Sequence, residues 1–273
     1  MPELPEVETT RRGISPYIES ATITTVTIRN HSLRWPIETN LANILTGQTI
    51  HSIKRRAKYL LFFCDSGTLI IHLGMSGKLR ILDSNTASNA EKHDHFEMLF
   101  DNGQLLRYND PRRFGCILWT TAPIEQHKLL AHLGPEPLTD EFDADYLFQQ
   151  IRSRKCSIKT LIMNGKVVVG VGNIYASESL FLAKIHPKTT AKQLTKKQCK
   201  LLVEAIKLIL EQAIEAGGTT LKDFRKSDGN PGYFAQKLNV YGRKGKMCTH
   251  CNSTIEHYKE LQRATFFCPS CQQ

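Results

Sequence analysis

Two pairs of closely spaced cysteines near the C-terminal end constrain the fold more than any other feature of this sequence. Cys248 and Cys251 form the first pair, Cys268 and Cys271 form the second, and sixteen residues separate the pairs. Two thiolate pairs presented by two turns make a tetrahedral site that suits Zn²⁺. Two disulfides are the alternative for this spacing, but disulfides are rare in cytosolic proteins. We therefore expect one structural zinc ion that pins a small basic β-hairpin, with no coordination position left for a substrate water.

Positive charge gathers around this predicted hairpin. The chain carries 36 Lys/Arg and 26 Asp/Glu, a net charge of +10, and the stretch from Gly217 to the end holds nine basic and four acidic residues. Half of the excess therefore lies in the last fifth of the chain. This balance predicts a polyanionic partner, nucleic acid first and an acidic membrane second. A generally basic, solvated surface is the alternative interpretation.

The sequence carries no sign of membrane insertion or export. It has no run of eighteen apolar residues, and its N-terminus is acidic rather than basic and then apolar. We therefore expect a cytoplasmic, nucleoid-associated protein. A length of 273 residues allows two domains with a core each.

The hydrophobic pattern changes from short strands to helices about halfway along the chain. Strand-like alternation recurs over roughly the first 125 residues, and Asn102-Gly103 between two such runs is a strong hairpin signal. Many short strands with turns between them predict a β-sandwich or barrel. Four helices are expected after the turn-rich stretch 132–137, at 141–152, 157–163, 173–184 and 195–216. The fold class is thus α+β and multidomain.

The first residues suggest chemistry at the N-terminus. Removal of Met1 would leave Pro2 with a free secondary amine, which attacks a carbonyl carbon such as that of an opened sugar to give an iminium. Glu3 is placed to move protons. Leu4 and Val7 recur with helical spacing, so one buried face could hold the terminus still. An ordinary acidic helix start is the alternative for this stretch alone.

Three further turns carry residues suited to nucleic acid. A Gly-rich turn precedes Asn173, which could cap a helix or donate to phosphate. Met75 lies between glycines, and Arg112 and Phe114 lie in a turn after Asp110-Pro111. On a DNA-binding protein, such side chains can fill the gap left by an extruded base, although on most proteins they are packing residues.

Taken together, these pieces resemble the formamidopyrimidine-DNA glycosylase family of bacterial 8-oxoguanine repair enzymes. The resemblance rests on motifs along essentially the whole chain, at residues 2–8, 55–58, 72–77, 92–95, 110–115, 168–178, 217–224, 232–234 and 241–244 and at the cysteine pairs. It implies an N-terminal β-sandwich with an N-terminal helix (residues 1–131), a helix-two-turn-helix domain (132–218), a lesion-capping loop (219–239) and a zinc finger (240–273). Double-stranded damaged DNA would lie in the cleft between the domains, bound by a monomer without an obligate protein partner.

The resemblance also implies a role for individual residues. Pro2 would attack C1′ of the damaged nucleotide and form a Schiff base, with Glu3 as proton donor, and the strand would be cleaved by β,δ-elimination. The expected site residues are listed by role: Pro2, Glu3, Lys58 and Arg263 for catalysis; His93, Arg112, Arg154, Lys159, Asn173 and Tyr241 for DNA contact; Met75, Arg112 and Phe114 for insertion; Glu6, Glu178, Thr219, Thr220 and Tyr233 for the lesion pocket; Cys248, Cys251, Cys268 and Cys271 for zinc.

Other functions fit parts of the sequence. A zinc-dependent damaged-DNA-binding protein without catalysis would need only the basic finger and the helices. An endonuclease VIII-like enzyme shares the N-terminal proline but prefers oxidised pyrimidines, and an RNA-binding factor is disfavoured only by the resemblance. The glycosylase mechanism requires that Met1 be removed, because an acylated Pro2 nitrogen is an amide and cannot attack.

Overall fold

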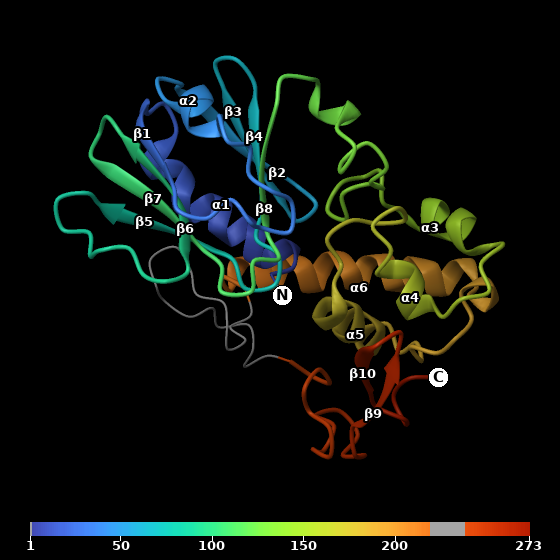
Figure 1. Cartoon of the computed structure of the whole chain (residues 1–273). Helices are drawn as coiled ribbons and strands as arrows, with labels where there is room; N and C mark the ends of the chain where they lie inside the picture. The colour runs from blue at the N-terminus through green and yellow to red at the C-terminus, as the bar shows by residue number, and fades with distance from the viewer. Residues whose placement is uncertain (1, 219–237) are drawn as a thin grey trace. The chain divides into compact units, whose positions relative to one another are not determined.

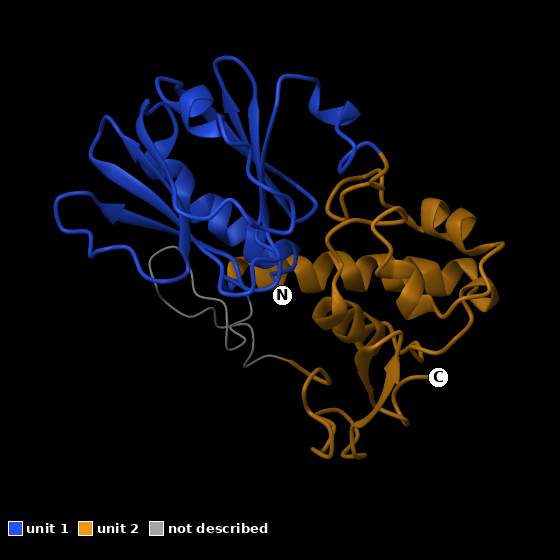
Figure 2. Ribbon diagram, in the orientation of Figure 1, with its two compact units in different colours: residues 1–131, 216–233 blue, residues 132–215, 234–273 orange. Residues whose placement is uncertain are grey.

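The computed structural model describes residues 2–218 and 238–273. The chain divides into two compact units (Figure 2). In their described parts, the first unit holds residues 2–131 and 216–218, and the second holds residues 132–215 and 238–273. Residues 219–237, which include the predicted pocket residues Thr219, Thr220 and Tyr233, lie outside the described residues.

Two four-stranded antiparallel sheets form the first unit (Figure 1). The strands of one sheet, in spatial order, are β1 (Ile23–Ile28), β6 (Asp94–Phe100), β7 (Gln104–Asn109) and β5 (Lys78–Asp83). Those of the other are β2 (Ile50–Arg56), β3 (Tyr59–Cys64), β4 (Thr68–His72) and β8 (Cys116–Thr120). Asn102-Gly103 connects β6 to β7 as predicted, and the φ of +78° at Gly103 explains the preference for glycine there.

Side chains from both sheets meet in one hydrophobic core, which makes this unit a β-sandwich. Phe96 and Met98 of one sheet belong to the same buried cluster as Phe62 and Ile71 of the other. Alternation of apolar residues with period two places these side chains on one face of each strand. The sandwich that the sequence predicted is therefore confirmed.

Two helices pack on the sandwich. Helix α1 (Leu4–Ile18) contacts β2, β3 and β5, and its buried apolar residues have the predicted helical spacing. The short helix α2 (Leu41–Leu45) was not predicted, because five residues are too few to show helical periodicity.

Helices dominate the second unit. They are α3 (Ala144–Ile151), α4 (Ile158–Ile162), α5 (Asn173–Leu182) and α6 (Lys196–Glu215), with α3 and α5 packed against α6. The side chains of Asp143 and Ser157 cap α3 and α4 by accepting backbone N–H groups. All four helices lie within a few residues of the predicted ranges. Short 3₁₀ turns lie at Ile124–Gln126 in the first unit and at Ala191–Gln193 in the second.

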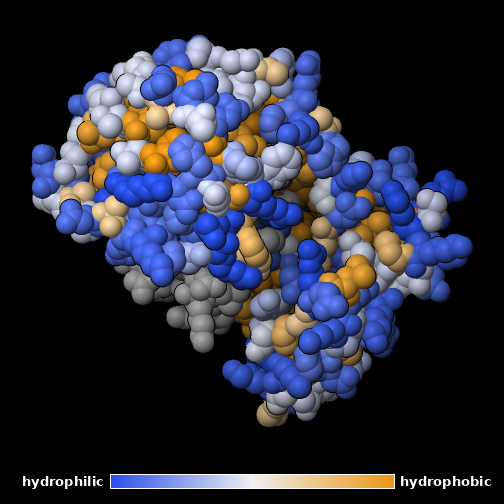
Figure 3. Space-filling view, in the orientation of Figure 1, coloured by the Kyte–Doolittle hydropathy of each residue, from blue (hydrophilic) through white to orange (hydrophobic). Residues whose placement is uncertain are grey.

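The second unit also carries a two-stranded hairpin of β9 (Glu256–Glu260) and β10 (Arg263–Phe267). Phe181 of α5 shares a small buried cluster with Val240, Ile255 and two of the cysteines. The predicted fold class, a sandwich followed by helices and a C-terminal cysteine-bearing hairpin, is thereby confirmed. On the visible face of each unit, hydrophilic side chains predominate (Figure 3). Among the described helices, none combines the length and apolar character needed to cross a bilayer.

Candidate active site

The N-terminal proline is held by the start of α1. Pro2 is buried, Glu3 is 3% exposed, and the first residue of the helix, Leu4, is fully buried in the core. The backbone N–H of Glu3 donates to Glu6 Oε2 at 2.8 Å, which closes the first turn of the helix. The terminus is therefore fixed by packing and capping, as a nucleophile at a chain end requires.

The turn that carries Lys58 is tied to the same helix. Ala57 and Lys58 connect β2 to β3, and Ala57 adopts a φ of +54°. Arg55 stabilises this turn by donating from NH1 to the carbonyl of Ala57 at 2.9 Å and from Nε to Glu8 Oε2 of α1 at 3.2 Å. Arg55 thus links the turn that carries Lys58 to α1, the helix that begins directly after Pro2 and Glu3.

Glu8 is the centre of this link. Burial alone would raise the pKa of Glu8, but hydrogen bonds from Arg11 and Arg12 and the charge of Arg55 outweigh it and hold the pKa below its ordinary value. Glu8 is thus an ionised acceptor for three arginines. The sequence analysis assigned it no role, because its partner Arg55 is 47 residues away in the chain.

The predicted pocket residue Glu6 lies against Gly218 within the first unit. Glu6 is 2% exposed, and a Cβ atom on Gly218 would lie 3.2 Å from Glu6 Cγ and Oε1. Gly218 also has a φ of +82°, so a side chain there would be both strained and crowded. Gly218, the last described residue before the gap at 219–237, therefore lies beside Glu6.

Strand pairing brings the Met75 turn and the Arg112–Phe114 turn together. The first turn joins β4 to β5 and the second joins β7 to β8, while β4 pairs with β8 and β5 pairs with β7. Each turn therefore crosses from one sheet to the other, and the two turns lie side by side. A Cβ atom on Gly74 would lie 2.3 Å from the Phe114 carbonyl carbon, so only glycine permits this approach.

Arg112 and Phe114 form an exposed pair on the second turn. The guanidinium of Arg112 lies 5.0 Å from the centroid of the Phe114 ring, which is 42% exposed. Arg113 between them adopts a φ of +55°. An exposed aromatic ring with a cation stacked on it is suited to contact with a nucleobase.

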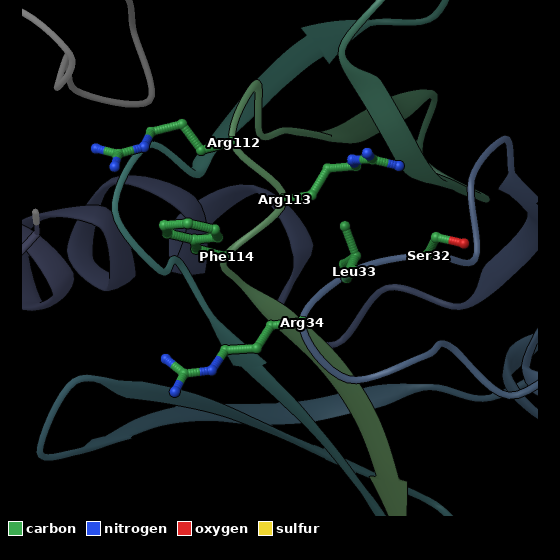
Figure 4. A pocket seen from close by; sticks show the side chains of 6 residues that line it. All are labelled: Ser32, Leu33, Arg34, Arg112, Arg113 and Phe114. Atoms are coloured by element: carbon green, nitrogen blue, oxygen red, sulfur yellow. The ribbon is translucent and has the colours of Figure 1, made fainter.

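A basic pocket of about 550 Å³ adjoins this pair (Figure 4). It is lined by Ser32, Leu33, Arg34, Arg112, Arg113 and Phe114. The sequence analysis did not identify Arg34, which lies in an irregular segment without a motif. The charge of Arg34 also lowers the pKa of His72 in β4.

The environment of His72 strongly disfavours its charged form. Burial, and then the charges of Lys58 and Arg34, lower the pKa of His72 to about 4. Its Nδ1 accepts the backbone N–H of Gly74 at 3.0 Å, which requires that nitrogen to be unprotonated. A neutral His72 therefore supports the Met75 turn. His93, a predicted DNA contact, is half-buried and accepts the Asp110 N–H at its backbone carbonyl.

In the second unit, Lys159 has a different environment from the one predicted. The sequence analysis placed it at the DNA surface, but its side chain is 2% exposed. Its ammonium lies 2.6 Å from Asn173 Oδ1, 2.7 Å from Thr265 Oγ1 and 3.4 Å from the Ala264 carbonyl. These acceptors offset the cost of burying the charge, so Lys159 connects α4, α5 and β10 internally.

Asn173 is oriented by that contact. Its Oδ1 accepts from Lys159, and its Nδ2 donates to the Ala264 carbonyl at 3.0 Å. Asn173 is the first residue of α5, where backbone N–H groups attract anions. Arg154 is exposed on the loop between α3 and α4, and its DNA contact stays a prediction.

Glu178 holds the backbone that leads into the finger, and its place in the lesion pocket stays a prediction. It is 1% exposed, and Oε1 accepts the N–H groups of Val240 and Tyr241 at 2.9 and 2.8 Å. Oε2 accepts the Asn239 N–H at 2.8 Å. Sequence alone could not reveal these contacts, because it does not show which backbone groups a buried helical glutamate will meet. Tyr241 packs against Phe266, with ring centroids 5.1 Å apart.

The tip of the β9–β10 hairpin presents Arg263. Leu261 and Gln262 form the turn with φ values of +44° and +65°, and Arg263 is exposed directly after it. Opposite Arg263, Glu260 accepts the Ser157 hydroxyl at Oε1 over 2.6 Å and the Thr160 hydroxyl over 3.1 Å. The tip is therefore anchored to α4.

The four cysteines converge as the sequence predicted. The Sγ atoms of Cys248, Cys251, Cys268 and Cys271 all lie within 4.8 Å of one another, and all four thiols are free. Such a cluster can hold a metal ion. Gln272 then connects the cluster to the end of α5, since its Oε1 accepts the Cys268 N–H and its Nε2 donates to the Ile185 carbonyl, both at 2.9 Å.

Comparison with known proteins agrees with the resemblance along the whole chain. Residues 1–117 match the formamidopyrimidine-DNA glycosylase N-terminal domain, and residues 133–225 match the H2TH domain of the same enzymes. The chain is 59% identical to formamidopyrimidine-DNA glycosylase of Hydrogenovibrio crunogenus, over 100% of this chain and 97% of that protein. It is 55% identical to that of Escherichia coli, over the full length of both.

Solved structures give the same result. The Lactococcus lactis enzyme in complex with DNA that contains an abasic site aligns with a TM-score of 0.92 at 37% identity, over 100% of both chains. The Thermus thermophilus enzyme aligns with a TM-score of 0.88 at 36% identity, over 99% of this chain and 98% of that one.

Proposed function

This chain belongs to the formamidopyrimidine-DNA glycosylase family, and we propose that it excises oxidised purines from double-stranded DNA in base-excision repair. Its substrates would be 8-oxoguanine and formamidopyrimidines. A variant of the Lactococcus lactis relative was crystallised with DNA containing Fapy-dG, which supports the second of these. The other Lactococcus complexes with damaged DNA support the same class of partner. The protein acts as a monomer on DNA and is both a glycosylase and an abasic-site lyase.

The burial of Pro2 beside Glu3 at the start of α1 is the observation that carries this proposal. After removal of Met1, the Pro2 nitrogen bonds to C1′ as the N-glycosidic bond breaks, and the base leaves with the bonding electrons and a proton. Opening of the sugar ring then gives a C1′=N iminium. Glu3 donates and accepts the protons at these steps.

The iminium withdraws electrons and acidifies the hydrogens on C2′. Loss of one of these protons expels the 3′ phosphate, and a second elimination expels the 5′ phosphate. Lys58 and Arg263 are proposed to assist the strand cleavage, by their positive charge near the departing phosphates. The anchoring of the Lys58 turn on α1 and of the Arg263 tip on α4 supports these roles.

The remaining site residues are proposed to position the DNA. Exposed Arg112 and Phe114 and half-buried Met75 fill the space left by the extruded base, which costs a few kcal/mol to unstack. His93, Arg154, Asn173 and Tyr241 contact the backbone, with Lys159 fixing the Asn173 amide from inside. Glu6 and Glu178 are proposed to line the lesion pocket together with Thr219, Thr220 and Tyr233, which lie outside the described residues. The proposed domain boundaries are 1–131, 132–218, 219–239 and 240–273.

The four cysteines are proposed to hold one Zn²⁺ ion per chain. Four thiolates within 4.8 Å of one another fit the tetrahedral preference of zinc, and they occupy all of its positions. The ion would hold the finger together and take no part in the reaction.

Trapping of the covalent intermediate tests this function. Borohydride should reduce the iminium and link the protein to an 8-oxoguanine·C duplex, with the adduct at residue 2. Pro2→Gly should lower the yield strongly, and Glu3→Gln should abolish base release while duplex affinity stays nearly unchanged. Absence of any adduct with the Met1-free wild-type protein would leave a DNA-binding protein without catalysis.

Intact mass and a lesion panel complete the test. Met1 retained in fully active protein would refute attack by Pro2. The panel should include an oxidised pyrimidine, because one Lactococcus complex holds DNA with such a lesion. A preference for the pyrimidine over 8-oxoguanine would overturn the proposed purine specificity.

A further inference from the structure

Asp110 is a fully buried carboxylate between the two turns that carry the proposed insertion residues. Its exposed fraction is 0%, and its Oδ1 accepts the Ser76 hydroxyl at 2.6 Å. Its Oδ2 accepts the Gly115 N–H at 2.9 Å and the Tyr108 hydroxyl at 3.1 Å. These three donors are neutral groups from different places in the chain.

Ser76 completes a bridge between the turns. It is 5% exposed, and its Oγ both donates to Asp110 and accepts the backbone N–H of Arg112 at 3.2 Å. One hydroxyl therefore joins the residue after Met75 to the backbone of Arg112. The distance in sequence between Ser76 and Asp110 is 34 residues.

The contacts around this bridge leave little room for the turns to move separately. The Asp110 backbone carbonyl accepts His95 Nε2 at 2.9 Å, and the Arg113 N–H at 3.2 Å. A Cβ atom on Gly115 would lie 2.5 Å from the His72 carbonyl oxygen, so the backbones of the two connections are in direct contact. Close-packed groups of this kind move as one body.

We propose that the Ser76–Asp110 bridge is the positioning device that makes the two turns act as a single wedge. This proposal rests on the proposed function, in which Met75 and the Arg112–Phe114 pair occupy the space of the extruded base. A wedge made of two independent turns would lose conformational entropy at each turn when it enters the duplex. The bridge orders the two turns before DNA binds, so less conformational entropy is lost when they enter the duplex. Ser76 and Asp110 thus assist base extrusion without touching DNA.

Ser76→Ala tests the bridge. Removal of the hydroxyl leaves the Asp110 carboxylate with one buried donor fewer, so base release from an 8-oxoguanine·C duplex should slow by roughly tenfold. Strand cleavage at a preformed abasic site in single-stranded DNA needs no extrusion and should stay within about twofold of wild type. The fluorescence rise of 2-aminopurine placed beside the lesion should slow together with base release.

A double-mutant cycle with Asp110→Asn separates a bridge from two independent effects. If both residues act through one contact, the double variant should lose no more than the larger single loss. Additive losses would overturn the proposal. Ser15→Ala is the matched control, since it removes another buried hydroxyl of the first unit, from α1.

The outcomes distinguish this proposal from the proposed function. No borohydride adduct with the wild-type protein would refute the glycosylase itself. Normal trapping by Ser76→Ala with unchanged duplex rates would refute the bridge and leave the glycosylase standing. An equal loss on the duplex and on the single-stranded abasic site would show a general defect of the fold and would also refute the bridge.

Discussion

The carboxylate of Glu178 accepts the backbone N–H of Val240 at 2.9 Å, which ties helix α5 to the segment that leads into the four cysteines. Three successive backbone N–H groups, from Asn239 to Tyr241, meet this one side chain. Both carboxylate oxygens are therefore satisfied by backbone donors, as a buried polar side chain requires. The finger is thus attached through main-chain N–H groups, which in the segment itself only a substitution by proline would remove.

Glu178→Gln should weaken this attachment. A glutamine keeps one acceptor oxygen and turns an N–H₂ group toward backbone donors, so we expect the free energy of unfolding to fall by roughly 1–3 kcal/mol. Urea denaturation measures the change. Glu211→Gln, on the exposed face of α6, is the control and should leave stability unchanged. Equal stability of the two variants would contradict the anchoring role.

Glu260→Gln should impair strand cleavage more than DNA binding. The Glu260 carboxylate anchors the hairpin tip to Ser157 and Thr160, and Arg263 is its cross-strand neighbour. Loss of this charged acceptor should slow elimination at an abasic site by roughly tenfold, because Arg263 is held less firmly. Gel-based strand scission measures the rate.

Glu256→Gln provides the control for that experiment, since Glu256 is an exposed residue of the same strand. Ser157→Ala should reproduce part of the Glu260→Gln defect. A loss of duplex affinity equal to the loss of rate would instead indicate a direct electrostatic role for Glu260.

Chelation of the metal ion that the four cysteines are proposed to hold should unfold the finger while the sandwich remains folded. The buried cluster of the finger consists of Phe181, Val240, Cys248, Ile255 and Cys268, which is too small a core to fold without a cross-link. Hydrogen exchange should then show loss of protection in β9 and β10 and none in β6 and β7. Duplex affinity should fall at least about tenfold, because the Arg263 tip is lost. Persistent protection of β9 and β10 would show that the metal is dispensable.

His72 predicts an acid-sensitive component of stability. Its pKa is lowered to about 4 in the folded protein from 6.5, so the unfolded chain takes up the proton first as the pH falls. The stabilisation is therefore complete above pH 6.5 and is lost as the pH falls toward 4, by up to roughly 3 kcal/mol. Urea denaturation at pH 7 and at pH 4.5 should show this loss in wild type and a smaller one in His72→Gln. His132→Gln, at an exposed histidine, should behave like wild type.

Local patterns in the sequence were sufficient for most of the secondary structure. Alternation with period two identified the strands, Asn102-Gly103 identified the turn between β6 and β7, and the two Cys-x-x-Cys pairs identified the cysteine cluster. These signals depend on neighbouring residues, so they can be recognised along the chain. The five-residue helix α2 was not predicted, because it is too short to show helical periodicity.

The burial and the partners of charged residues could not be predicted from local sequence patterns. Lys159 was expected to contact DNA and Glu178 to line the lesion pocket, and both are buried with protein partners. The partners lie 14 to 106 residues away from Lys159, so their presence depends on how α4, α5 and β10 pack.

The sequence by itself determined the elements, the cysteine cluster and the family, because each is encoded by residue types at short spacing. Only the tertiary structure decided which charges are internal, that Arg55 anchors the Lys58 turn on α1, and that Ser76 meets Asp110. These relationships arise where strands distant in sequence become neighbours in a sheet, and hydrogen bonds between such positions leave no pattern in a single chain.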